Sequence, residues 1–126
     1  MKFTAWSAPM LSVLRIVSSL TFLEHGTGKF LGFPVLPHLP SAGSLPWYGG
    51  IIELVGGVLL LLGLFSRPVA LLLSGEMAVA YFVAHFPHSP FPAINGGDAA
   101  ILFCFVFLYI AVAGPGPWSL DRRGRA

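Results

Sequence analysis

Four hydrophobic segments, each near the length that a membrane-spanning helix requires, divide this chain. Each segment carries one acidic residue inside it or at its edge: Glu24, Glu53, Glu76 and Asp98. A spanning helix needs about 20 mostly apolar residues. An ionisable side chain is costly in a bilayer, so it marks a functional position that faces the interior of a helix bundle. The pattern therefore predicts a four-helix transmembrane bundle with a polar interior.

The overall composition favours the same class. The chain has 126 residues, of which 56% are hydrophobic and 10% are charged. Soluble domains carry about 25% charged residues, so we predict an integral membrane protein that forms one all-α domain over residues 1–126. The formal net charge is +2, and the basic residues cluster at segment ends, which argues against a nucleic-acid interface. The single cysteine, Cys104, excludes an intrachain disulfide and CxxC chemistry.

Prolines and capping residues place the helix boundaries. We expect helices over about residues 9–29, 47–65, 67–86 and 97–113. Proline-rich stretches interrupt the chain after the first and third helices. Ser66 is expected to cap the third helix, with Pro68 in its first turn. The apolar N-terminal stretch contains Arg15 and has no A-x-A-like cleavage site, so it is interpreted as a retained first helix rather than a signal peptide.

The basic residues predict the topology. Arg122, Arg123 and Arg125 lie in the tail 119–126, and an excess of Lys and Arg marks the cytoplasmic side of a membrane. Four spans then place the N-terminus, with Lys2, in the cytoplasm as well. We expect a bacterial inner membrane as the location. In this orientation the acidic residues descend from an outward-opening pocket toward the membrane centre.

Eight side chains are candidates for ligand binding or proton exchange, with no catalytic role assigned to any of them. They are Arg15, Glu24, His25, Glu53, Glu76, His85, Asn95 and Asp98. By depth, Arg15 is expected to pair with Glu76, or failing that with Glu53. The pair would either fix the helix register or leave Arg15 to clamp an anionic or carbonyl-bearing ligand. Asn95 and Asp98 could equally cap the fourth helix and complement its dipole.

Metal and cofactor sites are not predicted within the chain itself. His25 and His85 fall at the outer ends of the first and third helices, but no helix carries H-x-x-x-H or E-x-x-H spacing. The sequence shows no flavin or nucleotide fingerprint and no paired haem ligands. Lys29 is expected to extend to the membrane surface instead of entering the site.

Several short motifs, taken together in order and spacing, resemble the DoxX family of small four-helix membrane proteins. Beside Arg15, they are FLEHGTGKFLGF at 22–33, ELVGG at 53–57, GLFSRPVA at 63–70, EMAVAY at 76–81 and NGGD at 95–98. The resemblance covers about residues 10–113. One departure is Asp98, where the family often has glutamate.

The resemblance implies a redox or quinone context, because DoxX-like proteins are associated with quinol oxidase and thiosulfate:quinone oxidoreductase systems and with oxidative stress. The first hypothesis is a membrane subunit whose pocket binds a small lipophilic molecule such as a quinone, with a redox partner protein. The second is a non-enzymatic lipid-binding, assembly or chaperone protein. The third is a small proton-coupled transporter, which would require an oligomer.

Overall fold

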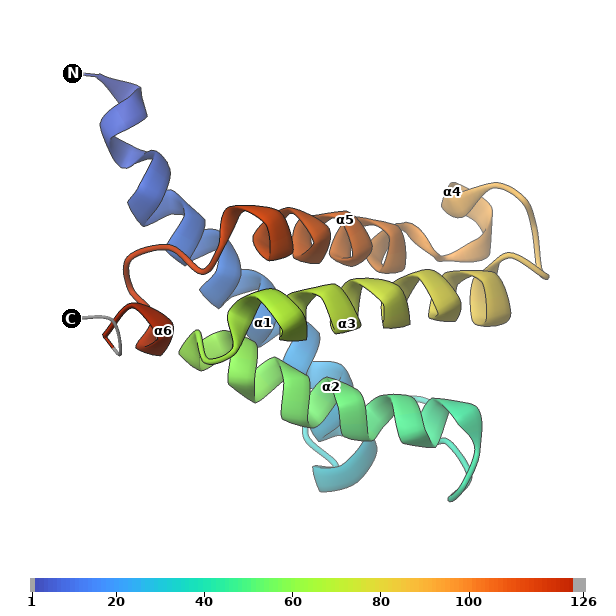
Figure 1. The fold of residues 1–126 in the computed structure, drawn as a ribbon. Helices are drawn as coiled ribbons and strands as arrows, with labels where there is room; N and C mark the ends of the chain where they lie inside the picture. The colour runs from blue at the N-terminus through green and yellow to red at the C-terminus, as the bar shows by residue number, and fades with distance from the viewer. Residues whose placement is uncertain (1, 124–126) are drawn as a thin grey trace.

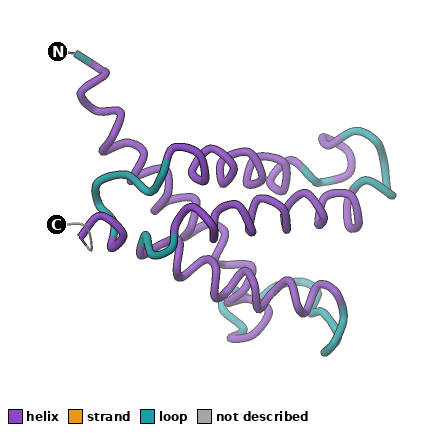
Figure 2. The backbone as a smooth tube through the Cα atoms, viewed as in Figure 1, coloured by secondary structure: helices purple, strands orange, loops and turns teal. Residues whose placement is uncertain are grey.

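The computed structural model describes residues 2–123, so the end of the predicted basic tail, including Arg125, lies outside the described residues. Every regular element in residues 2–123 is helical, which confirms the all-α prediction (Figures 1 and 2). The elements are η1 (Phe3–Trp6), α1 (Ser7–Leu31), α2 (Leu45–Leu62), α3 (Ser66–Ala80), the π-helical turn η2 (Tyr81–His85), α4 (Pro92–Asn95), α5 (Asp98–Ala113) and α6 (Leu120–Arg123).

Three of the helical segments are long and apolar enough to cross a membrane. They are η1 with α1 (Phe3–Leu31), α2 (Leu45–Leu62), and α3 with η2 (Ser66–His85). The remaining long helix, α5, has 16 residues. At 1.5 Å per residue it extends about 24 Å, which is shorter than a hydrocarbon core of about 30 Å. The fourth span therefore stays a prediction.

The turn between α2 and α3 differs from the expected one. The second helix was expected to continue to residue 65, but α2 ends at Leu62 because Gly63 turns the chain with a φ of 71°. Ser66 was expected to cap α3, and this was wrong, since it makes no capping hydrogen bond. The Asp121 carboxylate accepts the backbone N–H groups of Phe65 and Ser66 instead, each at 2.9 Å. A side chain near the C-terminus thus caps α3.

The long helices form two antiparallel pairs, α1 with α2 and α3 with α5. The helices α2 and α3 diverge from the tight turn that joins them, so the pairs separate toward the opposite end of the molecule (Figure 1). The start of α1 and the short helix α6 lie at the end that holds this turn, and we refer to it as the terminal end (Figure 1). We refer to the opposite end as the loop end, because the long connections after α1 and after η2 lie there (Figure 2).

Glycines allow α1 and α2 to approach closely. A Cβ atom on Gly26 would lie 2.8 Å from the backbone nitrogen of Leu54, and one on Gly57 would lie 2.9 Å from Cδ1 of Leu23. Small residues permit such contacts between membrane helices, where dispersion forces between closely packed atoms stabilise association. The α1/α2 pair therefore depends on backbone-to-backbone contact at Gly26.

Replacing Gly26 with alanine is expected to destabilise the protein by about 1–3 kcal/mol, because the new methyl group would overlap the Leu54 backbone. The measurement is the apparent melting temperature of the purified protein in mild detergent. Gly75→Ala is the matched control, since a Cβ at Gly75 would meet no atom within 4 Å. Equal melting temperatures for the two variants would show that the close α1/α2 contact contributes little.

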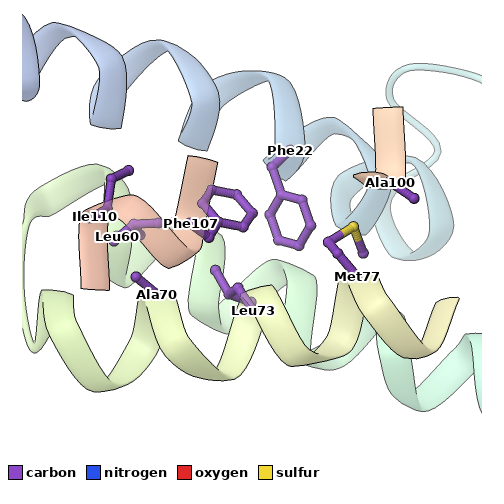
Figure 3. Close-up of a cluster of buried hydrophobic side chains, with 8 residues drawn as sticks. All are labelled: Phe22, Leu60, Ala70, Leu73, Met77, Ala100, Phe107 and Ile110. Carbon is purple, nitrogen blue, oxygen red and sulfur yellow. The ribbon is translucent and has the colours of Figure 1, made fainter. Parts of the chain in front are cut away.

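The core of the bundle is an apolar cluster to which all four long helices contribute (Figure 3). Its members are Phe22, Leu60, Ala70, Leu73, Met77, Ala100, Phe107 and Ile110. Phe22 of α1 packs edge-on against Phe107 and Phe103 of α5, with ring centroids 5.0 and 5.5 Å apart. These aromatic contacts connect one helix pair to the other.

Candidate functional site

A cavity of about 990 Å³ lies between the two helix pairs. Side chains from α1, α2, α3, η2 and α5 line it, and most of them are apolar, such as Ile52, Met77 and Phe103. Leu71 and Leu72 line the cavity and are also 58% exposed on the surface of the molecule. The cavity therefore opens sideways between α2 and α3, in the direction that lipid would occupy if α2 and α3 span the membrane.

Lys29 and Glu53 form an ion pair in the cavity wall. Nζ of Lys29 lies 2.8 Å from Oε2 of Glu53, and the two side chains are 16% and 7% exposed. We expected Lys29 to extend to the membrane surface, and this was wrong. Its aliphatic stem passes over Gly50, where a Cβ would lie 2.8 Å from Cδ of Lys29. The absence of a side chain at Gly50 thus leaves room for Lys29 to turn inward.

Glu76 reaches the same place from α3. Its carboxyl group lies beside that of Glu53 and within electrostatic reach of Lys29. Its Oε1 lies 3.1 Å from where a Cβ on Gly49 would be, so the absence of a side chain at Gly49 makes room for Glu76. Oε2 of Glu76 is buried and receives no hydrogen bond from a donor in the described residues. Two carboxylates accept but cannot donate, so the contact with Glu53 becomes a hydrogen bond when one of them carries a proton.

The two histidines lie toward the loop end of the cavity. His25 lines it from α1, with its ring centroid 6.3 Å from that of Phe103. His85 lines it from η2, and its Nδ1 lies 3.1 Å from the backbone oxygen of Asn95. The ring of His85 also stacks on that of Tyr81 at an interplanar angle of 25°. His25 is thus the less constrained of the two and the better placed to meet a bound molecule.

The other residues expected at the outer mouth have different positions. Asn95 is 8% exposed and organises the turn before α5: its Nδ2 donates to Ser89 O at 2.9 Å and its Oδ1 accepts from Gly97 N at 2.8 Å. Asn95 therefore does not cap α5 directly. Glu24 and Asp98 are exposed and do not line the cavity, and Asp98 opens the first turn of α5. Of the eight candidates, four line the cavity: His25, Glu53, Glu76 and His85.

Arg15 lies at the terminal end, away from this cavity, and does not pair with Glu76 as expected. Its side chain is buried, with Nη1 donating to Pro115 O and Nη2 donating to Trp118 O at 2.7 Å. Asp121 is the acidic residue that acts on it electrostatically. The expectation from depth was wrong because the chain after α5 folds back over α1 and supplies carbonyl oxygens at the depth of Arg15.

Sequence reasoning missed Lys29 and Asp121 as organising charges. A signal for Lys29 was present, because it is the one basic residue near the loop ends of the expected helices and could reach Glu53. Asp121 gave no such signal, since it lies in a short polar tail without helical periodicity. Among the described residues, no group of three or more His, Cys, Asp or Glu side chains is arranged to hold a metal ion.

Comparison with known proteins gives a consistent family and several membrane relatives. The profile of the DoxX family matches residues 10–86. An uncharacterized protein of Haemophilus influenzae is 44% identical over 119 residues, covering 90% of this chain and 89% of that protein. Inner membrane protein YphA of Escherichia coli is 31% identical, covering 96% and 94%, and an uncharacterized membrane protein of Mycobacterium tuberculosis is 30% identical, covering 91% and 81%. No solved structure matches the chain.

Proposed function

The chain belongs to the DoxX family of membrane proteins, and we propose that its central cavity binds a small lipophilic molecule with a polar head, such as a quinone. The observation that carries the proposal is the polar cluster of Lys29, Glu53 and Glu76 in the wall of a large apolar cavity. Ligand pockets are typically apolar with a few converging polar groups that fix orientation.

The chemistry of the cluster suits a carbonyl or hydroxyl head. The Lys29 ammonium can donate to a carbonyl oxygen, while a carboxylate of Glu53 or Glu76 can accept from a hydroxyl group. A quinone presents carbonyl oxygens, and its reduced form, the quinol, presents hydroxyl groups. The apolar walls and the sideways opening between α2 and α3 would hold a hydrocarbon tail in contact with lipid.

The cellular role that we propose is in redox metabolism or redox-stress defence at a bacterial inner membrane. Any electron transfer would involve a partner protein or the bound molecule itself, because the sequence carries no fingerprint of a redox cofactor. We propose that both termini are cytoplasmic, which places the loop end of the cavity on the outer side. The opening itself lies sideways between α2 and α3, and not at the outer surface as the sequence suggested. The start of α1 and the helix α6 lie at one end of the bundle, which supports an even number of spans (Figure 1).

The test is organic extraction and mass spectrometry of the protein purified in mild detergent. We expect a lipophilic molecule at a stoichiometry near one per chain. Glu53→Gln is expected to reduce that amount about tenfold, because one charge-assisted hydrogen bond of about 1.4 kcal/mol is lost. Folding should persist in this variant, since Glu76 remains within electrostatic reach of Lys29.

Glu24→Gln is the matched control, because Glu24 is exposed on α1 and does not line the cavity. Its ligand content should equal that of the wild type. A folded Glu53→Gln protein with undiminished ligand would contradict the proposal. A wild-type protein that carries no molecule, and that does not bind an added short-chain quinone, would favour an assembly or chaperone role.

Proton-coupled transport is the other function that a specific observation favours. The carboxyl groups of Glu53 and Glu76 lie side by side in the cavity, and such pairs can pass a proton between them. This role requires a flux of protons or substrate in reconstituted vesicles, whereas a binding protein requires none.

A further inference from the structure

A second cavity, of about 640 Å³, lies at the terminal end of the molecule. The first turns of α1 and α3, the last turn of α5 and the chain that follows α5 enclose it. It shares one lining residue with the central cavity, Pro68, and none of the polar residues in the proposed ligand site. Its chemistry can therefore be considered independently of the proposed function.

Three charged side chains line this cavity: Arg67, Arg122 and Asp121. Nη1 of Arg67 donates to the backbone oxygens of Ala111, at 3.1 Å, and Val112, which holds the guanidinium at the end of α5. Its Nη2 and Nε have no hydrogen-bond partner among the described residues. The Asp121 carboxylate already accepts two backbone N–H groups at the start of α3. The two guanidinium groups thus leave an excess of one positive charge in the wall.

A buried hydroxyl group gives an independent indication of a polar ligand. Ser66 lines the cavity and is 1% exposed, yet its Oγ has no hydrogen-bond partner among the described residues. A buried polar group without a partner is costly, and in native proteins it usually has a water molecule or ligand as its partner. Ser66 directly precedes Arg67 in the chain, so the unpaired hydroxyl group and the Arg67 guanidinium enter this wall from adjacent residues.

The rest of the wall is mixed, since it holds Ser7, the chain at residues 114–117 and an apolar side. Leu11, Phe65 and Tyr109 contribute to it. Trp6 and Trp118 are 54% and 58% exposed at the same end of the molecule, and tryptophan concentrates where lipid headgroups meet the hydrocarbon. A site with positive charge, a free hydroxyl and an apolar side, at this depth, fits a phosphodiester attached to acyl chains.

We infer that this second cavity binds the phosphodiester headgroup of an anionic phospholipid. Arg67 and Arg122 would contact the phosphate oxygens, the Ser66 hydroxyl would donate to one of them, and the acyl chains would leave along the apolar side toward the lipid. Basic pockets between membrane helices recognise anionic headgroups by this combination of contacts. Under the predicted topology the lipid would come from the inner leaflet.

The test is native mass spectrometry of the full chain released from nanodiscs that contain equal amounts of phosphatidylglycerol and phosphatidylcholine. We expect the protein to retain at least fivefold more phosphatidylglycerol than phosphatidylcholine. One favourable contact with a basic residue gives a preference of about this size. Arg122→Gln is expected to lower this retention about fivefold, again the value of one basic residue near a membrane surface. Ser66→Ala should lower it too, without loss of stability, because the hydroxyl has no protein partner to lose.

Lys2→Gln is the matched control, since it removes a positive charge at the terminal end from a residue that does not line the cavity. It should leave the lipid ratio unchanged. Equal retention of the two lipids by the wild type would overturn the inference. So would unchanged retention in both Arg122→Gln and Ser66→Ala. Displacement of the lipid by millimolar inorganic phosphate would overturn the lipid assignment and identify a site for soluble phosphate.

Discussion

Replacing Arg15 with leucine is expected to destabilise the protein by about 3 kcal/mol and to release the segment that follows α5. The guanidinium group donates to the carbonyl oxygens of Pro115 and Trp118, and the substitution leaves both partly buried oxygens without this donor. Removing a buried cation recovers part of its desolvation cost, which is why the expected loss stays below the sum of the separate hydrogen bonds.

Two measurements check this expectation. The apparent melting temperature in detergent should fall, and trypsin should cleave after Arg122 faster than in the wild type, because Arg122 lies in α6, which is attached to the released segment. Arg15→Lys is the matched variant, and it should lose about half as much stability, since one ammonium cannot reach both carbonyls with the geometry of a guanidinium. If Arg15→Leu matches the wild type in both measurements, the buried arginine does not hold the segment.

The same variant separates the stability of the fold from the proposed ligand site. Arg15 does not line the central cavity, so the Arg15→Leu molecules that remain folded should retain the wild-type amount of ligand. A loss of ligand in those molecules would mean that the terminal end communicates with the cavity. Sequence reasoning gave the opposite expectation, because it placed Arg15 among the candidate ligand-binding residues.

The parts of the structure that the sequence predicts are those governed by local rules. Apolar length predicts the long helices, and the cost of a charge in lipid predicts that Glu53 and Glu76 turn inward. Both carboxyl groups do lie in the interior, at 5% exposure for Glu53 and with a buried Oε2 for Glu76. The glycines near Glu53 belong to the same local pattern, and two of them, Gly50 and Gly49, make room for Lys29 and Glu76.

The parts that the sequence does not predict depend on contacts between segments far apart in the chain. Depth along a helix suggests which charges could meet, but not how the helices rotate or which irregular segment folds over them. Arg15 finds its partners about 100 residues away, in a proline- and glycine-rich stretch that has no periodicity to reveal its path. The cap of α3 by Asp121 is likewise a contact between distant segments. The capping preference of serine had favoured Ser66 instead.

Replacing Lys29 with methionine is expected to destabilise the protein by about 3–5 kcal/mol, which is more than the loss expected for Glu53→Gln. The ammonium is shared between two carboxyl groups: it lies 2.8 Å from Glu53 and within electrostatic reach of Glu76. Without it, two adjacent buried carboxyl groups have no cation nearby. Glu53→Gln removes one negative charge and leaves Lys29 with Glu76, so that variant retains a balanced pair.

The double variant Lys29→Met/Glu53→Gln decides whether the larger stability loss of Lys29→Met, compared with Glu53→Gln, comes from charge. It removes one charge of each sign from the cluster, so we expect it to recover most of the stability lost in Lys29→Met, as read from melting temperatures in detergent. Lys2→Met is the control for the substitution itself and should be neutral, because Lys2 is exposed and lies outside the helices. If the double variant is no more stable than Lys29→Met, the lysine contributes through packing of its stem over Gly50 rather than through charge. In that case the carboxyl groups do not need a cation to remain in the cavity wall.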